Sequence, residues 1–297
     1  MLCSTDENPF QATRIEKYQI IDGLKHIYPV QRLCRVLLIT RRSYYWWLNR
    51  GKPLANNINQ KDLELFTVEH FNTKEVYGVL RLKYHIQRKY GFIYNHKKIR
   101  RYKRLFNLDT ITRKRRPLYL RTTKKESHLN MAPNVLDCNF TSDSPYQKLS
   151  TDVSYIKCTD GTLYLSAVKD LFNNEIVSYS ISNRNDGELV KKTLEQIPKG
   201  NGIIHSDQGG LYFSLLYRIK LKELGYTRSM SRRGACWENS PIENWFSQLK
   251  EEHLRPIGKK TMKVTKQEIK KYVQWYNHER IQKSLNYLTP VQYLQNV

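Results

Sequence analysis

The sequence lacks the features that would point to secretion, a membrane or covalent catalysis. Its five cysteines are scattered and odd in number, without a C-x-x-C pair, so neither a disulfide framework nor a zinc knuckle is supported. No apolar run approaches the roughly 18 residues that span a bilayer. The opening MLCSTDENPFQATR has no basic-then-apolar signal pattern, and no G-x-S-x-G or Cys-His signature indicates a protein nucleophile. We therefore expect a protein of the reducing cytoplasm.

Acidic residues are scarce beside basic ones. The 297 residues include 51 Lys and Arg against 27 Asp and Glu, a formal net charge of +24. Residues 1–130 hold 28 basic and 10 acidic residues, whereas residues 131–297 hold 23 and 17, so the nets are +18 and +6. The strong positive charge of residues 1–130 favours an anionic partner. Duplex DNA is such a partner, and the counterions that it releases on contact with basic residues drive binding. The alternative is a basic or ribosome-associated protein of another kind.

Length and composition indicate a folded protein with more than one domain. Hydrophobic residues make up 39%, with 21 Tyr and five Trp, and 297 residues are enough for a sizeable core. We expect five segments: an N-terminal helical segment over 1–50, a basic helical DNA-binding domain over 57–110, a basic linker over 111–145, a core of strands and helices over 146–260, and a C-terminal helical extension over 261–297.

Residues 14–49 have a helical pattern. Pro29 suits the first turn of a second helix, and Thr40 can cap a third, RRSYYWWLN. Helix, turn and basic helix are compatible with a helix-turn-helix that contacts DNA, and equally with a small helical bundle. The face expected to be apolar in the first helix consists of Ile15, Tyr18, Ile21, Leu24 and Ile27.

A second helical block contains the densest positive charge. We expect helices over KDLELFTVEHFNT, from about Gly78 to Tyr90, and over NHKKIRRYKRLFNL, which Asn95 can cap. The following TRKRRPLYLRTTKKE, which includes Arg115 and Arg116, has no regular period and is predicted to be a linker that lies along DNA. Six cations in eight residues of the last helix favour phosphate contact over a merely solvated face: Lys97, Lys98, Arg100, Arg101, Lys103 and Arg104.

From about Lys148 the pattern changes to strands and helices. Three strand-like runs, KLSTDVSYIKC, TLYLSAVKDLF and NEIVSYSISN, are separated by turn residues and predict an antiparallel meander. A helix, the short strand GIIHSD, a helix, the strand YTRSMS and an amphipathic helix near Glu243 follow, with a last helix from Val264 to Glu279. This order predicts an α/β ribonuclease H-like core, a five-stranded mixed sheet flanked by helices, preceded by an all-α DNA-binding region.

Three carboxylates occupy distinctive places in this pattern. Asp152 lies mid-strand, where a charge costs stability unless it faces solvent or a metal. Asp207 ends its strand at the carboxyl edge, where open α/β sheets place their ligands. Glu243 lies in the first turn of its helix, where a glutamate also serves as an ordinary partner of the helix dipole. Carboxylates suit Mg²⁺, and two such ions can support the cutting and joining of a polyanion.

Other polar residues near these three allow more than one interpretation. His205 points to the same side of its strand as Asp207, so it either supports the site or binds phosphate, or is a packed neutral histidine. Gln208 fits a loop that approaches the site closely. Asp160, Asp170 and Glu238 are set aside as turn or loop residues.

Longer segments of the sequence resemble a known family. HSDQG, RRGACWENSPIENWFSQLKEE and WYNHERIQKSLNYLTPVQY, together with upstream segments from EVYGVLRLKYHI onward, resemble the second-frame (OrfB-type) transposases of bacterial insertion sequences. The catalytic core of that family resembles retroviral integrase. The similarity covers roughly residues 30–295. A mild departure is Gly210, where the family commonly has a serine.

The resemblance implies an Asp-Asp-Glu transposase that cuts at element ends and joins the freed 3′-hydroxyl to target DNA. It implies that Asp152, Asp207 and Glu243 are the catalytic ligands of two Mg²⁺ ions, with Mn²⁺ as a substitute. Lys250 matches a basic position on the face of the helix that touches DNA, and Ser247 shares that face. The closing aromatic residues Tyr272, Trp275 and Tyr276 are expected to be core, and Arg280 to dock their helix.

The resemblance also implies partners and a location. These are DNA, a first-frame (OrfA-type) product or fusion, and further copies of the chain on DNA, in the nucleoid of a bacterial cytoplasm. No leucine heptads precede Arg14, so we expect the first-frame segment to be absent. Two alternatives stay open: a DNA-binding regulator or first-frame partner with an inactive core, and a hydrolytic ribonuclease H-like nuclease.

Overall fold

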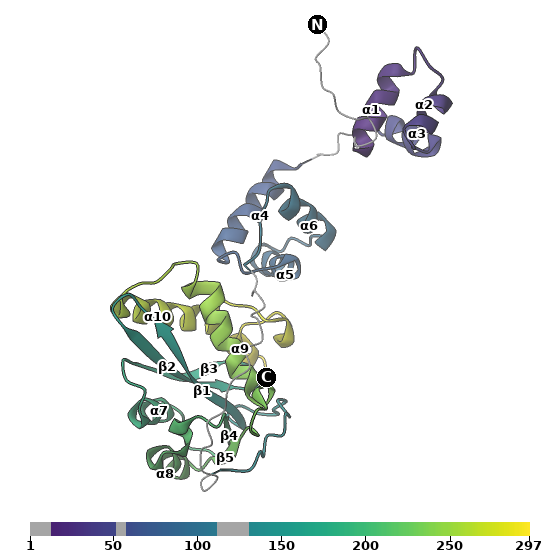
Figure 1. The fold of residues 1–297 in the computed structure, drawn as a ribbon. Coiled ribbons are helices and arrows are strands. Elements are labelled where there is room, and N and C mark those ends of the chain that lie inside the picture. The colour runs from purple at the N-terminus through teal and green to yellow at the C-terminus, as the bar shows by residue number, and fades with distance from the viewer. Residues whose placement is uncertain (1–12, 52–57, 112–130) are drawn as a thin grey trace. The chain divides into compact units, whose positions relative to one another are not determined.

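The fold is known from a computed structural model that describes residues 13–51, 58–111 and 131–297 (Figure 1). It divides into two compact units, Met1–Leu65 and Phe66–Val297. The predicted linker residues Arg115 and Arg116 lie outside the described residues. No helix in the described ranges is both long and apolar enough to cross a bilayer.

The first unit contains three short helices, α1 (Arg14–Leu24), α2 (Val30–Val36) and α3 (Arg41–Asn49). Thr40 caps α3 as predicted, because its side chain accepts a hydrogen bond from the Ser43 backbone N–H. The expectation for Ile27 is wrong: α1 ends before it, and its side chain is 69% exposed. The helices pack on a small core of Tyr18, Ile21, Cys34, Leu37, Tyr44 and Trp47.

A second helical group comprises α4 (Gln60–Asn72), α5 (Val79–Tyr90) and α6 (His96–Leu105), and the boundary between the two units falls within α4. Asn95 caps α6 by accepting from the Lys97 N–H. One of the six α6 cations does not fit the predicted phosphate contact. Lys103 is buried, with its ammonium 3.0 Å from His70 Nδ1, because its position on α6 faces α4.

The remainder is built on one five-stranded sheet. Its strands are β1 (Lys148–Lys157), β2 (Thr162–Asp170), β3 (Ile176–Ser182), β4 (Ile203–Ser206) and β5 (Thr227–Met230). The spatial order is β3-β2-β1-β4-β5, with β1 to β3 antiparallel and β4 and β5 parallel to β1. The predicted meander and ribonuclease H-like mixed sheet are confirmed.

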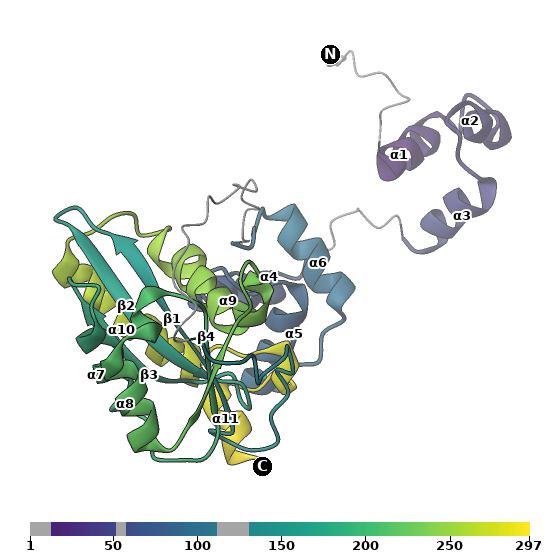
Figure 2. The ribbon, with the colours of Figure 1, turned by 60° about the horizontal axis from the view of Figure 1, so that its bottom comes forward.

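Helices cover both faces of the sheet (Figures 1 and 2). On one face α7 (Gly187–Leu194) and α8 (Leu215–Leu224) bury an apolar cluster with β1, β2, β4 and β5. On the other face lie α9 (Ser240–Leu249) and α10 (Met262–His278). The predicted aromatic stripe of α10 is core as expected, since Tyr272, Trp275 and Tyr276 are buried.

The C-terminal residues join the sheet to the helical group within the second unit. Arg280 is 2% exposed and donates to the Glu252 carboxylate through Nε and Nη2, so its predicted docking role is confirmed. The Tyr77 hydroxyl contacts the backbone on either side of Arg280, donating to the Glu279 carbonyl at 3.1 Å and accepting from the Ile281 N–H at 3.0 Å. The chain ends in α11 (Pro290–Gln295).

Candidate active site

Parallel pairing of β1 with β4 brings Asp152 level with Asp207. Ser150 pairs with His205 across the two strands, and the same offset of 55 residues separates Asp152 from Asp207. Neighbouring strands lie about 4.8 Å apart. Because β4 ends at Ser206, the edge of β1 is open beyond this point. Both carboxylates line one pocket of about 170 Å³, which we call the carboxylate pocket.

Helix α9 is fastened to β1 at two points. At its start, the buried Asn239 accepts a 2.7 Å hydrogen bond from the Ser150 hydroxyl and donates through Nδ2 to the Thr151 carbonyl at 3.1 Å. At its end, the Lys250 ammonium donates to the Ser154 hydroxyl at 2.6 Å. Ser150 and Ser154 project from the same face of β1, since side chains alternate along a strand. The helix therefore runs along the strand on this face.

These two anchors carry Glu243 to the height of Asp152. Glu243 follows Asn239 by four residues, about 6 Å of helix at 1.5 Å per residue. Asp152 follows Ser150 by two residues, about 7 Å of strand, and shares its face. The two residues thus lie at similar heights along packed elements.

The electrostatics of Asp152 reflect this crowding of negative charge. Burial raises the pKa of Asp152 well above its ordinary value, and the charges of Asp207 and Glu243 raise it further. Two groups lower the pKa of Asp152 without reversing the net rise: the Val153 N–H, which donates to Asp152 at 2.7 Å, and the Lys250 ammonium. Buried acidic groups that raise one another's pKa favour a bound cation.

The loop after β4 holds the second carboxylate. Asp207 accepts a 2.9 Å hydrogen bond from the Gly209 N–H. A Cβ on Gly209 would lie 2.9 Å from the same carboxylate oxygen, so a residue without a side chain allows this close approach. Gln208 turns the other way and donates to the Ser231 carbonyl at 3.0 Å, which ties the loop to the segment following β5.

The donor chemistry fits a hard divalent cation, because three carboxylates are the oxygen ligands that Mg²⁺ prefers. Asp152 and Asp207 share a pocket, whereas Glu243 is not among the residues that line it. Among the described residues, no group of three or more His, Cys, Asp or Glu side chains is placed so that it could hold a metal ion. The structure therefore pairs Asp152 with Asp207 in one pocket and does not bring all three carboxylates together as a metal site.

His205 is the packed neutral histidine that the sequence left open. It is fully buried, with Nδ1 2.8 Å from the Ser229 hydroxyl and Nε2 2.9 Å from the Ser231 hydroxyl. Burial lowers the pKa of His205 to about 4, so the ring is neutral at physiological pH. Both ring nitrogens are engaged by the β5 side of the sheet, which leaves neither for a phosphate.

The three acidic residues set aside have structural roles. Asp170 accepts from the backbone of Tyr146 and Phe172, and Asp160 accepts from the Met262 N–H. Glu238 is fully buried and accepts from both the backbone and the guanidinium of Arg232.

The role of Asn239 in holding α9 against β1 was not predicted from the sequence. The spacing could have indicated it, because Asn239 precedes Glu243 by four residues and residues four apart share a helix face.

The predicted DNA-contact residues lie in separate places. Lys250 opens a π-helical turn, η4 (Lys250–Leu254), directly after α9, and Ser247 on α9 is half-buried. Lys98 is half-buried on α6, with its ammonium 5.1 Å from the ring centre of Tyr94. The other predicted contacts on α6 are exposed: Lys97, Arg100, Arg101 and Arg104.

Comparison with known proteins gives consistent matches. Family models described as integrase core domain match residues 142–236 and 243–297. The putative transposase InsK for insertion sequence element IS150 of Escherichia coli is 32% identical over 282 residues, covering 93% of this chain and 96% of that protein. An uncharacterized transposase-like protein of Haemophilus influenzae is 39% identical over 168 residues, 55% of this chain and 78% of that protein.

A solved structure gives a weaker match. The HTLV-2 integrase catalytic core domain in complex with magnesium, in its dimeric form, is 15% identical, with a TM-score of 0.40. The match covers 50% of this chain and 97% of that one.

Proposed function

The chain belongs to the insertion-sequence transposases with an integrase-type catalytic core, and on that premise we propose that it cuts DNA at the ends of an insertion element and transfers the freed 3′-hydroxyl to target DNA. The observation that carries the proposal is the shared pocket of Asp152 and Asp207, with the Glu243 helix fastened alongside.

We propose that Asp152, Asp207 and Glu243 hold two Mg²⁺ ions, for which Mn²⁺ can substitute. When bound, such ions supply positive charge to the attacking and leaving oxygens of a phosphodiester. The carboxylates give this site its negative charge, and the Asn239 contacts with β1 fix the height of Glu243. The Lys250 ammonium, held on Ser154, lies close enough to influence Asp152 and can balance the charge of an entering phosphate.

We propose that the basic helical half binds the DNA. The exposed cations of α6 form one phosphate-binding surface. Arg115 and Arg116, predicted from the sequence to lie along DNA, would add further phosphate contacts. Such contacts are independent of sequence, so they position DNA without selecting the element ends.

The proposed reaction requires several DNA segments in one complex. A chain that joins two element ends to a target must hold more than one DNA segment, so we propose that the active form is at least a dimer on DNA. We also propose that a first-frame product or fusion contributes to recognition of the element ends, and that the protein acts in the nucleoid.

A strand-transfer assay on labelled linear DNA carrying candidate element ends tests the proposal. Asp207→Ala should reduce cutting and joining by about three orders of magnitude or more, while DNA binding stays close to that of the wild type. Asp143→Ala removes an exposed carboxylate that does not line the carboxylate pocket and serves as the matched control. DNA binding without cutting by the wild type would indicate a regulator, and cutting without joining a hydrolytic nuclease.

A further inference from the structure

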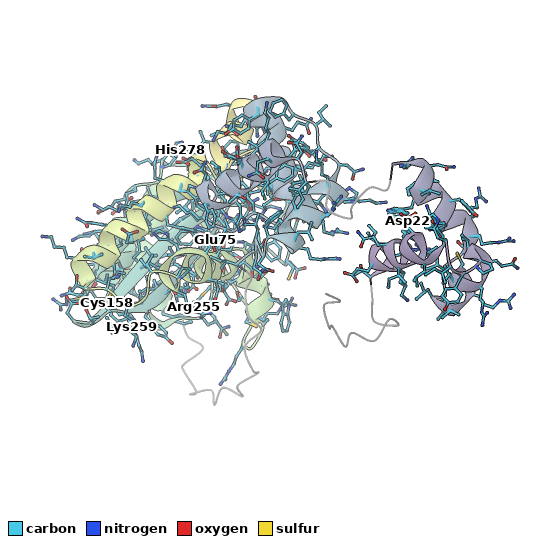
Figure 3. All side chains as sticks on the ribbon, turned by 90° about the horizontal axis from the view of Figure 1, so that it is seen from above. Asp22, Glu75, Cys158, Arg255, Lys259 and His278 are labelled. Carbon is cyan, nitrogen blue, oxygen red and sulfur yellow. The ribbon has the colours of Figure 1, made fainter. Side chains whose placement is uncertain are left out.

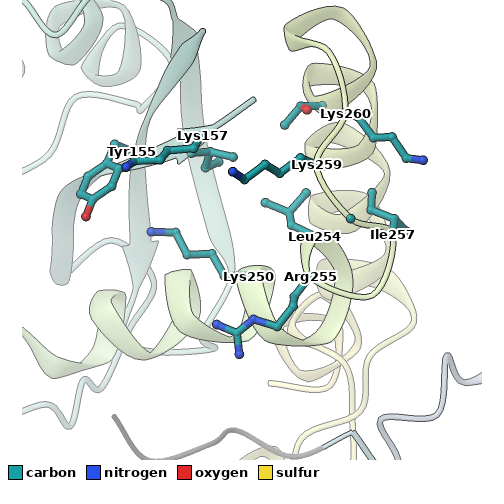
Figure 4. Close-up of a pocket in the computed structure, with 11 residues that line it drawn as sticks. Tyr155, Lys157, Lys250, Leu254, Arg255, Ile257, Lys259 and Lys260 are labelled. Atoms are coloured by element: carbon teal, nitrogen blue, oxygen red, sulfur yellow. The ribbon is translucent and has the colours of Figure 1, made fainter. Parts of the chain in front are cut away.

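A second pocket adjoins the carboxylate pocket and shares Tyr155 with it. Its volume is about 380 Å³, and its walls come from β1, the η4 turn, the loop 257–260 and the start of α10. Five of its eleven lining residues are Lys or Arg, and none is Asp or Glu. We call it the basic pocket (Figure 4).

Three ammonium groups make the basic pocket positive. Lys157 comes from β1, Lys250 from η4 and Lys259 from the loop before α10, and the Lys250 and Lys259 side chains extend toward β1 (Figure 4). Lys260 points away from the strand, and Arg255 forms an ion pair with Glu251. In the part of the chain that the structure describes, Lys157 and Lys259 have no carboxylate partner.

Tyr155 presents an aromatic ring among these cations. It is 59% exposed and lies on the part of β1 beyond the end of β4. The Lys250 ammonium lies 5.2 Å from the centre of its ring. An exposed ring beside cations is the combination with which proteins bind unpaired nucleotides, because the ring stacks on a base while the cations bind the backbone.

The walls of the basic pocket are fixed to each other. The Thr159 N–H donates to the Lys260 carbonyl at 3.0 Å, and the Met262 N–H donates to Asp160 at 2.7 Å. Figure 3 shows Cys158 and Lys259 at one end of the core, at the opposite end of α10 from His278. The loop that carries Lys259 is therefore tied to the turn between β1 and β2.

We propose that the basic pocket binds an unpaired nucleotide of the DNA strand, adjacent to the nucleotide whose phosphate enters the carboxylate pocket. Its base stacks on Tyr155, and its phosphates lie among Lys157, Lys250 and Lys259. The volume of about 380 Å³ suits a single nucleotide, and a paired base inside a duplex cannot present its face to the ring. This inference rests on the proposed function for the identity of the ligand as DNA.

Binding of tailed and blunt DNA to the full chain tests the stacking. The probes are a duplex of about 20 base pairs and the same duplex with a single-stranded tail of about five thymidines. We expect the wild type to prefer the tailed duplex, Tyr155→Ala to lower that preference about fivefold or more, and Tyr155→Trp to retain it. Both variants change an exposed residue, and circular dichroism checks their folding. An unchanged preference in Tyr155→Ala would overturn the proposal.

A pair of charge variants tests the phosphate contacts. Lys157→Ala with Lys259→Ala should reduce the dependence of tailed-DNA affinity on salt by about one power of concentration per lysine. Lys266→Ala with Lys270→Ala removes two exposed lysines of α10 that do not line the basic pocket, and should leave this dependence unchanged. Equal effects of the two pairs would contradict a specific role for the pocket.

These binding measurements do not depend on cutting. If Tyr155 controls the preference for tailed DNA but the wild type never cuts or joins DNA, the proposed function fails and the pocket assignment stands. If the wild type joins DNA and Tyr155→Ala keeps the preference, the pocket assignment fails and the proposed function stands.

Discussion

The Ser150 hydroxyl donates a 2.7 Å hydrogen bond to the Asn239 side chain, and both residues are buried. This bond joins the strand of Asp152 to the helix of Glu243. The relative position of the two residues therefore depends in part on a polar contact in which neither carboxylate takes part.

Asn239→Ala should disturb the site without touching DNA. Removal of the amide leaves the Ser150 hydroxyl and the Thr151 carbonyl without their partner, so unfolding should require about 1–3 kcal/mol less free energy. Joining should fall at least about tenfold, because a small misplacement of a catalytic group is costly. Urea unfolding and strand transfer measure the two effects. Asn201→Ala, at an exposed position, is the control. Normal joining by a destabilised Asn239→Ala would refute the positioning role.

The α6 surface should govern the salt dependence of DNA affinity. Arg100→Ala with Arg104→Ala removes two exposed cations, so the slope of log affinity against log salt should become shallower by about two. Lys103→Met is the contrasting variant, because Lys103 is buried against His70. It should change stability and leave the slope alone. The reverse result, with Lys103 controlling the slope, would show that α6 does not bind DNA through its exposed face.

The order of elements was predictable because each strand and helix has its own local pattern. The alternation in KLSTDVSYIK and the turn residues after it indicate β1 and the meander, and Thr40 and Asn95 are recognisable caps. Asp152, Asp207 and Glu243 were predicted as ligands from their motifs, and that role stays a prediction. Strand register accounts for the shared pocket of Asp152 and Asp207, and the contacts of Asn239 account for the place of the Glu243 helix.

The contacts between distant segments were not predictable from local patterns. The inward position of Lys103 depends on α4, and Asn239 acquires its role only when α9 packs on β1. The basic pocket combines Tyr155 with Lys259, which stand 104 residues apart in the sequence. A local sequence pattern cannot predict that two such distant residues line one pocket, so the pocket is found only in the folded structure.

The helical group should lose stability in acid through Glu69. Burial alone would raise the pKa of Glu69, but hydrogen bonds from Tyr90, Lys89, His85 and Asn72 outweigh burial and lower it to about 2. Since the folded-state pKa lies below the ordinary 4.5, this stabilisation is complete above that pH and is lost as pH falls toward 2. Between pH 6 and pH 3 the loss should be about 2 kcal/mol.

Urea unfolding of the wild type and of Glu69→Gln across this range measures the effect. The neutral side chain of the variant cannot titrate, so its stability should fall less steeply toward pH 3. Parallel curves for the two proteins would show that Glu69 does not contribute to the acid sensitivity.

Assembly should depend on DNA. We expect the chain alone to sediment mainly as a monomer and to form a dimer or larger species with DNA, because joining requires more than one DNA segment in one complex. Fusion of a first-frame segment before Met1 should increase end-specific joining. Efficient, end-specific joining by the unfused chain would place end recognition within this chain instead.

The central claim, that Asp207 acts as a metal ligand in DNA cutting and joining, is tested most directly by a change of metal preference. A thiolate is a poor ligand for Mg²⁺ but a better one for softer divalent ions. In the strand-transfer assay, Asp207→Cys should be inactive with Mg²⁺ and should regain measurable joining with Mn²⁺, whereas Asp207→Ala should stay inactive with both. Equal activity of Asp207→Cys in the two metals, or joining by Asp207→Ala at the wild-type rate, would contradict the account.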